Sequence, residues 1–101
     1  MTISYDKVNT ALPLYVGYGI TSYPKEDVSR LVSEFGSDLA AQMECEIKLL
    51  LTELDQLKPD WNTHSLISAA KWASEEIKRK HPELDSKAIT ALEWCFTWWW
   101  K

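Results

Sequence analysis

The sequence predicts an all-α fold, a compact bundle of four main helices with an irregular N-terminal segment, forming a single helical domain over residues 1–101. Apolar residues recur every three or four positions through most of the chain, which is the period of an amphipathic helix. The 4 prolines and 3 glycines fall between these periodic segments. The hydrophobic fraction of 46% is ordinary for a globular chain. Because the connections are short, neighbouring helices should be roughly antiparallel.

The N-terminal segment is expected to hold one short helix and an irregular connection. The helix covers residues 6–12, with Ser4 as its cap, and Pro13 should end it because proline cannot continue the helical hydrogen-bond ladder. Residues 14–20 carry two glycines and are too short for another helix. They should therefore form an extended connection or an irregular loop.

The first two main helices are separated by a glycine. Pro24 suits a first helical turn, and Gly36 suits a helix end. Ser37 then caps the second main helix, which should run to about Leu57 before Pro59 ends it. The expected inner face of the first helix consists of Val28, Leu31, Val32 and Phe35. That of the second consists of Leu39, Met43, Ile47, Leu50, Leu51, Leu54 and Leu57.

Polar capping residues mark the start of the last two helices. Asn62 or Thr63 should cap the third helix, which reaches about Lys80, and Asp85 or Ser86 should cap the fourth. The inner face expected for the third helix comprises Leu66, Ala69, Ala70, Ala73 and Ile77. That of the fourth comprises Ala88, Ile89, Leu92, Cys95, Phe96 and Trp99.

Tryptophan is unusually frequent, with 6 in the chain and four of these in residues 94–100. Helical geometry puts Trp94 and Trp98 on a flank of the last helix and Trp72 off the inner face of the third, where the three could form an exposed patch that anchors a partner. The favoured alternative is that the last helix is central, with Trp98 and Trp99 in the core and Trp72 more exposed. The N-terminal segment would then cover that flank instead of acting as an adaptable contact loop. Its tyrosines are Tyr5, Tyr15, Tyr18 and Tyr23.

The formal net charge is −4, from 15 acidic and 11 basic residues. This charge disfavours nucleic acid or an anionic membrane as the partner and suits a basic protein. Carboxylates stand on two opposite flanks of the second main helix and as an adjacent pair on the third, although helix solubility alone would also explain them. The residues that we expect to contact a partner are Glu44, Glu46, Glu53, Asp55, Trp72, Glu75 and Glu76.

No residue pattern indicates catalysis, a cofactor or a metal ion, so we expect a protein that is not an enzyme. His64 and His81 stand at the two ends of one predicted helix, roughly 25 Å apart, and helix-end or solvent roles account for both. The Cys-x-x-Cys, His-Glu-x-x-His and Walker patterns are absent from the sequence. Cys45 and Cys95 are expected to be small buried hydrophobes, since a disulfide between them would be unusual in a reducing compartment.

A cytoplasmic location is expected for this chain. Residues 1–7 do not show the basic region followed by an apolar stretch that a secretory signal has. The longest apolar run is far shorter than the ~20 residues that a membrane-spanning helix needs.

Small size, acidity, the missing catalytic pattern and the surplus of aromatic residues together resemble the small acidic immunity proteins of bacterial toxin–immunity pairs. The resemblance is one of general type and extends over the whole chain. It implies a protein that neutralises a basic toxin domain, expected to be a nuclease, by occluding its active site with carboxylates in the place of phosphates. Two other classes stay open. One is a structural or adaptor subunit that self-associates through an aromatic face, as a homodimer would. The other is a small enzyme or ligand-binding bundle with an aromatic-lined pocket.

Overall fold

The computed structural model describes residues 4–100, and this part of the chain forms five α-helices and no strand. The helices are α1 (Tyr5–Val16), α2 (Val28–Phe35), α3 (Ser37–Gln56), α4 (Leu66–Lys80) and α5 (Ser86–Trp99). The all-α class is therefore confirmed. The expectation of four main helices is wrong, because the N-terminal segment contributes a full helix of 12 residues.

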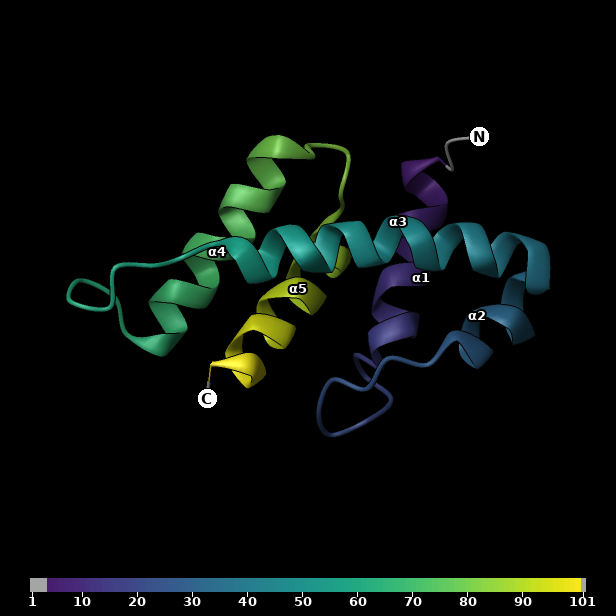
Figure 1. The fold of residues 1–101 in the computed structure, drawn as a ribbon, viewed down its shortest axis with the longest axis horizontal. Coiled ribbons are helices and arrows are strands. Elements are labelled where there is room, and N and C mark those ends of the chain that lie inside the picture. Colours follow the sequence, from purple (N-terminus) through teal and green to yellow (C-terminus); the bar gives the residue numbers. More distant parts are fainter. Residues whose placement is uncertain (1–3, 101) are drawn as a thin grey trace.

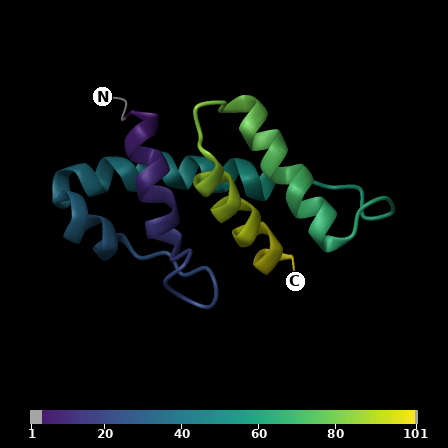
Figure 2. The same cartoon turned by 180° about the vertical axis from the view of Figure 1, so that it is seen from behind.

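The helices are arranged in two layers. α1, α5 and α4 lie side by side, with α5 between the other two (Figure 2). The long α3 crosses one face of this layer, and α2 packs beside the start of α3 (Figure 1). α4 and α5 run in opposite directions, as their short connection predicts, whereas α3 crosses the other helices instead of running along them (Figures 1 and 2). α5 consequently has neighbours on several sides.

The apolar faces predicted for α3, α4 and α5 meet between the two layers. Buried positions on α3 are Ala40, Met43, Ile47, Leu50, Leu51 and Leu54. Those on α4 are Ala69, Ala70, Ala73, Ser74 and Ile77. Those on α5 are Ala88, Ala91, Leu92, Cys95 and Phe96. On these three helices, the clear exception among the predicted inner-face residues is Trp99, which is 41% exposed.

Pro13 does not end α1, contrary to the prediction, and residues 14–16 are helical instead of extended. Tyr15 and Val16 are almost completely buried, and their burial stabilises a last turn that lacks one backbone hydrogen bond. The helix ends at Gly17, whose φ of 86° lies in the left-handed region. The Gly17 amide donates to the carbonyl of Pro13 at 3.0 Å, which satisfies a carbonyl at the end of the helix.

α2 is shorter than predicted, because Asp27 caps it and the preceding proline lies outside the helix. The hydroxyl and the backbone amide of Ser29 both donate hydrogen bonds to the Asp27 carboxylate, which lowers the pKa of that carboxyl. Of the predicted inner face, Leu31 is fully buried, whereas Val28 and Val32 are exposed. α2 therefore attaches to α3 through a narrower apolar contact than its sequence indicates.

The remaining caps agree only in part with the predictions. Asp85 caps α5 as predicted. α4 begins two to three residues later than predicted, because Ser65 and Ser68 form a capping box in which each side chain bonds the backbone amide of the other. Ser37 is the first residue of α3, and Gly36 occupies the capping position.

Candidate functional site

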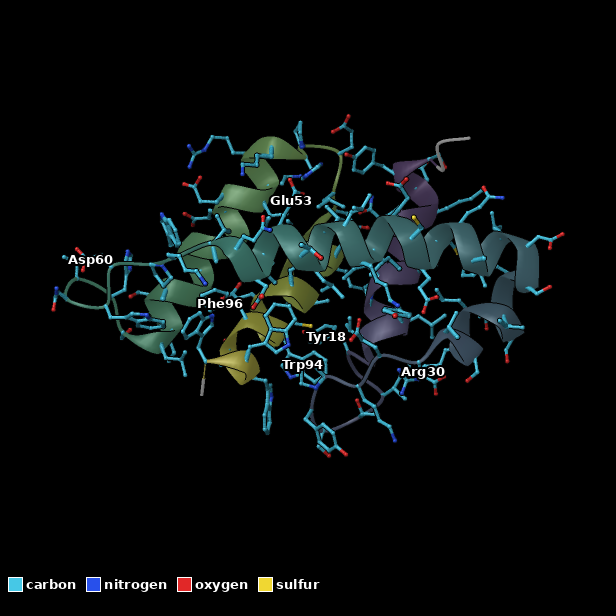
Figure 3. All side chains as sticks on the ribbon, viewed as in Figure 1. Tyr18, Arg30, Glu53, Asp60, Trp94 and Phe96 are labelled. Atoms are coloured by element: carbon cyan, nitrogen blue, oxygen red, sulfur yellow. The ribbon has the colours of Figure 1, made fainter. Side chains whose placement is uncertain are left out.

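The structure places the predicted carboxylates of α3 on two opposite flanks of that helix. Glu46 and Glu53 face the start of α1 and the end of α4. Glu44 and Asp55 lie on the other flank, towards the end of α1 and α5. Figure 3 shows Glu53 on α3 beside the end of α4.

The flank with Glu44 and Asp55 is tied into the fold and mixed in charge. The buried Tyr15 donates its hydroxyl hydrogen to Glu44 Oε2 at 2.9 Å, and Lys48 Nζ lies 4.0 Å from the same oxygen. Asp55 lines an open depression together with Lys48 and Glu26. This flank therefore presents less uncompensated negative charge than its carboxylates alone suggest.

The predicted contact residues on α4 do not join either flank of α3. Glu75 is exposed, and Glu76 forms an ion pair with Arg79 one turn later on the same helix. Trp72 is partly buried against the core, and the centroid of its ring lies 6.0 Å from the centroid of the His64 ring. None of these three predicted residues lines the depressions beside α3.

A hydrogen-bond chain connects three helices at the flank that carries Glu53. The Tyr5 hydroxyl oxygen lies 2.8 Å from Nδ1 of His81, and Nε2 of the same ring lies 2.7 Å from Oε2 of Glu53. A carboxylate can only accept, so Nε2 carries a hydrogen. In the tautomer whose hydrogen is on Nε2 alone, Nδ1 accepts the hydroxyl hydrogen of Tyr5. We call this arrangement the Tyr5–His81–Glu53 chain.

Backbone contacts hold the members of this chain in place. His81 occupies the C-cap of α4, where its amide donates to the Ile77 carbonyl at 2.8 Å. Asn9 joins α1 to the α4–α5 connection, because its side chain donates to the Glu83 carbonyl at 3.0 Å and accepts from the Asp85 amide at 2.9 Å. The start of α1 is therefore fixed beside the end of α4, which positions Tyr5 against His81.

The electrostatic environment decides what this chain can do chemically. Burial raises the pKa of Tyr5, and the negative charges of Glu83, Glu46 and Glu53 raise it further. The phenol therefore keeps its proton and can donate a hydrogen bond to His81. A tyrosine nucleophile needs the opposite shift of its pKa, so Tyr5 is not activated as a nucleophile.

A cavity of about 460 Å³ opens beside the Tyr5–His81–Glu53 chain. Val8, Leu49 and Leu50 supply its apolar wall, and Glu46 and Glu53 supply carboxylates. Leu49 is 58% exposed and lies between the two carboxylates on the same flank of α3. Within residues 4–100, no lysine or arginine lines this cavity. We call Glu46, Leu49 and Glu53 the acidic flank.

Sequence reasoning misses the role of the His81 ring. The backbone position is close to the prediction, since the residue does end α4. Its ring partners, however, are 28 residues away at Glu53 and 76 residues away at Tyr5, and no local motif spans such separations. The one usable signal is that Glu53 immediately precedes the buried Leu54, which places its carboxylate at the edge of a core face.

The predicted exposure of the tryptophans is wrong. Trp72 is partly buried against the core, whereas Trp98 and Trp99 are 39% and 41% exposed. Trp94 is partly buried and meets Tyr18 edge-on, with 5.5 Å between ring centroids. Figure 3 labels both residues. The N-terminal segment thus does cover one side of α5. The last turn of α5 lies at the end farther from α3 (Figure 1), although Trp99 still lines the open depression beside Lys48 and Asp55 of α3.

The two cysteines differ in burial. Cys95 is buried as predicted, and burial raises the pKa of its thiol to about 12. The prediction for Cys45 is wrong, because this residue is exposed on the side of α3 away from the apolar stripe. Both thiols are free.

The role of this site has to be interpreted from its own residues. Among residues 4–100, no group of three or more His, Cys, Asp or Glu side chains is placed to hold a metal ion. None of the helices in that range combines the length and apolarity that a bilayer crossing requires. No protein-family model, curated protein or solved structure gives a significant match to this chain.

Proposed function

We propose that this protein binds a basic protein and blocks it, in the manner of an immunity protein that neutralises a basic bacterial toxin such as a nuclease. The observation that carries the proposal is the acidic flank of α3. There the exposed Leu49 stands between Glu46 and Glu53 at the mouth of a cavity. An apolar centre within a polar rim is the usual plan of a protein–protein interface.

The charge of the molecule supports a basic partner. The net charge is −4, and within residues 4–100 no lysine or arginine lines the cavity beside the acidic flank. Carboxylates arranged in this way attract a cationic surface and raise the rate of encounter. On a nuclease, they would take the place of the phosphate groups of the substrate. Inhibition would then follow from occlusion of the active site.

The test begins with co-purification from the native host and identification of the bound protein by mass spectrometry. Binding of that protein, and the loss of its activity on binding, are then measured over a series of salt concentrations. Glu46→Lys and Glu53→Lys should slow association and reduce its salt dependence, because charges at an interface rim mainly steer encounter. Asp55→Lys, on the opposite flank of the same helix, is the matched control and should change binding less.

The proposal is wrong if the bound protein is not basic, or if its binding is indifferent to salt and to both reversals on the acidic flank. Circular dichroism and thermal melts of each variant show whether the fold is intact. This control matters most for Glu53, because its carboxylate also accepts a hydrogen bond from His81.

A second candidate function has its own supporting observation. Trp61, Trp99 and Trp100 are all exposed, and the rings of Trp61 and Trp100 lie 5.5 Å apart at one end of the molecule. Exposed aromatic clusters of this kind mark interaction surfaces. A structural or adaptor subunit would use this end for self-association. Sedimentation equilibrium should then reveal a dimer that Trp61→Ala dissociates, and a monomer at all concentrations would eliminate this candidate.

A further inference from the structure

The cavity beside α3 combines three kinds of wall. Leu49 and Leu50 provide apolar surface, Glu46 and Glu53 provide negative charge, and Tyr5 provides an aromatic ring. Its volume of about 460 Å³ exceeds what one side chain needs, so an occupant can bring an apolar neighbour with it. The bonds of Asn9 and the Tyr5–His81–Glu53 chain hold these walls in place before any ligand arrives.

We propose that this cavity receives the side chain of an arginine, together with an adjacent apolar residue, from the basic protein that binds the acidic flank. The inference rests on the proposed function, because it identifies the part of the partner that the site recognises.

The charge pattern of the cavity selects a cation. Two carboxylates, Glu46 and Glu53, line it, and within residues 4–100 no lysine or arginine side chain compensates them there. Burial and the charge of Glu83 raise the pKa of the Tyr5 phenol most, and the charges of Glu46 and Glu53 raise it further, so the field of this pair reaches the Tyr5 hydroxyl. An anionic ligand would lose hydration in this field and meet two like charges.

The available acceptor atoms favour a guanidinium. Oε2 of Glu53 accepts a hydrogen bond from His81 Nε2, so the second carboxylate oxygen is available to a ligand. Within residues 4–100, no hydrogen bond or ion pair engages the carboxylate of Glu46.

A guanidinium presents several N–H donors in a planar fork and can stack on an aromatic ring such as Tyr5. Its methylene stem would lie against Leu49, which buries apolar surface on both partners.

The proposal can be tested without the natural partner, by using the dipeptide acetyl-leucyl-arginine amide as the probe. The matched control peptide carries citrulline, which keeps the shape of arginine and lacks its charge. In heteronuclear NMR titrations, the arginine peptide should shift amide signals near Leu49 and His81. The citrulline peptide should bind at least roughly tenfold more weakly, as expected when a charged hydrogen bond is replaced by a neutral one.

Variants locate the binding in the cavity. Glu46→Gln should weaken binding of the arginine peptide roughly tenfold without a loss of stability, because no hydrogen bond or ion pair among residues 4–100 depends on that carboxylate. Asp55→Asn makes the same change of net charge on the opposite flank of α3 and should leave the affinity unchanged. Equal weakening by both variants would mean that the peptide senses net charge alone, and the cavity proposal would be wrong.

Other outcomes separate this proposal from the proposed function. If the citrulline peptide binds equally well, or the arginine peptide shifts no signals near the cavity, recognition of arginine here is wrong even where a basic partner still binds with salt-dependent affinity. Conversely, specific binding of the arginine peptide in a protein that has no basic partner would overturn the proposed function. In that case the cavity would still recognise a guanidinium, although the proposed function would be wrong.

Discussion

Removing one hydroxyl group, by Tyr15→Phe, should lower the free energy of unfolding by about 1–2 kcal/mol. The side chain of Tyr15 is 2% exposed, and its hydroxyl donates to Glu44 Oε2 at 2.9 Å. A hydrogen bond to a charged group contributes roughly 1.5–3 kcal/mol. We expect a value around the lower end of that range because the Glu44 side chain is 28% exposed, so water replaces part of the lost bond.

Urea unfolding followed by circular dichroism at neutral pH measures this loss. The double-mutant cycle of Tyr15→Phe with Glu44→Ala should give a coupling energy of about 1 kcal/mol, because the two groups contact each other directly. Tyr23→Phe is the matched control, since this ring is 51% exposed and its change should stay within about 0.5 kcal/mol. Equal effects of the two phenylalanine variants, or a coupling energy near zero, would refute the reasoning.

The same variant predicts a change at alkaline pH. Burial, followed by the hydrogen bond to Glu44, raises the pKa of Tyr15 above the value of about 10 that an unfolded tyrosine has. The folded state therefore keeps this proton where the unfolded state releases it. The resulting stabilisation is complete below about pH 10 and is lost as pH rises through the folded pKa.

The pH dependence of the Tyr15→Phe variant completes the first prediction, and two further predictions test the glycines after α1 and the two cysteines. Across pH 7 to pH 11, the stability deficit of the Tyr15→Phe variant should shrink, because only the wild type loses the tyrosine contribution; a constant deficit in urea titrations would contradict the assigned shift. Gly17→Ala should destabilise more than Gly19→Ala in thermal melts. Both glycines have positive φ, which disfavours alanine by roughly 1–2 kcal/mol. Only a Cβ at Gly17 would also meet the Thr21 hydroxyl, at 2.5 Å; equal losses would show that this crowding relaxes. Cys45 should react with a thiol reagent in the folded protein, whereas Cys95 should react only after unfolding; equal rates measured by mass spectrometry would contradict the burial of Cys95.

Much of the fold could be predicted because most helices carry their own signals. The apolar stripe of α3 repeats with helical period, and its members Met43, Ile47 and Leu54 are fully buried. The cap of α5 at Asp85 is equally local. Such features depend on residues within one or two turns of each other, so a sequence pattern contains the information that specifies them.

The errors arise where tertiary contacts outweigh a local rule. Proline usually ends a helix, yet α1 continues past Pro13 because the core buries Tyr15 and Val16 in the next turn. The apolar end of α5 suggests a buried turn, yet Trp99 is 41% exposed and lines an open depression that Lys48 and Asp55 of α3 also line. In both cases the deciding factor is the position of other helices, which a single helical pattern does not encode.

The candidate site could be predicted only as an inventory of carboxylates, because their roles depend on distant partners. Glu44 and Glu53 accept hydrogen bonds from tyrosine and histidine side chains, and Glu76 is paired with an arginine. Changing Glu44 or Glu53 perturbs the fold as well as any interface, whereas Glu76 lies in a surface ion pair away from the cavity. Glu46 has no such partner within residues 4–100, yet it lines the same cavity as Glu53. Of the α3 and α4 carboxylates considered for binding, Glu46 is therefore the one at the cavity whose substitution reports on binding with the least interference from stability.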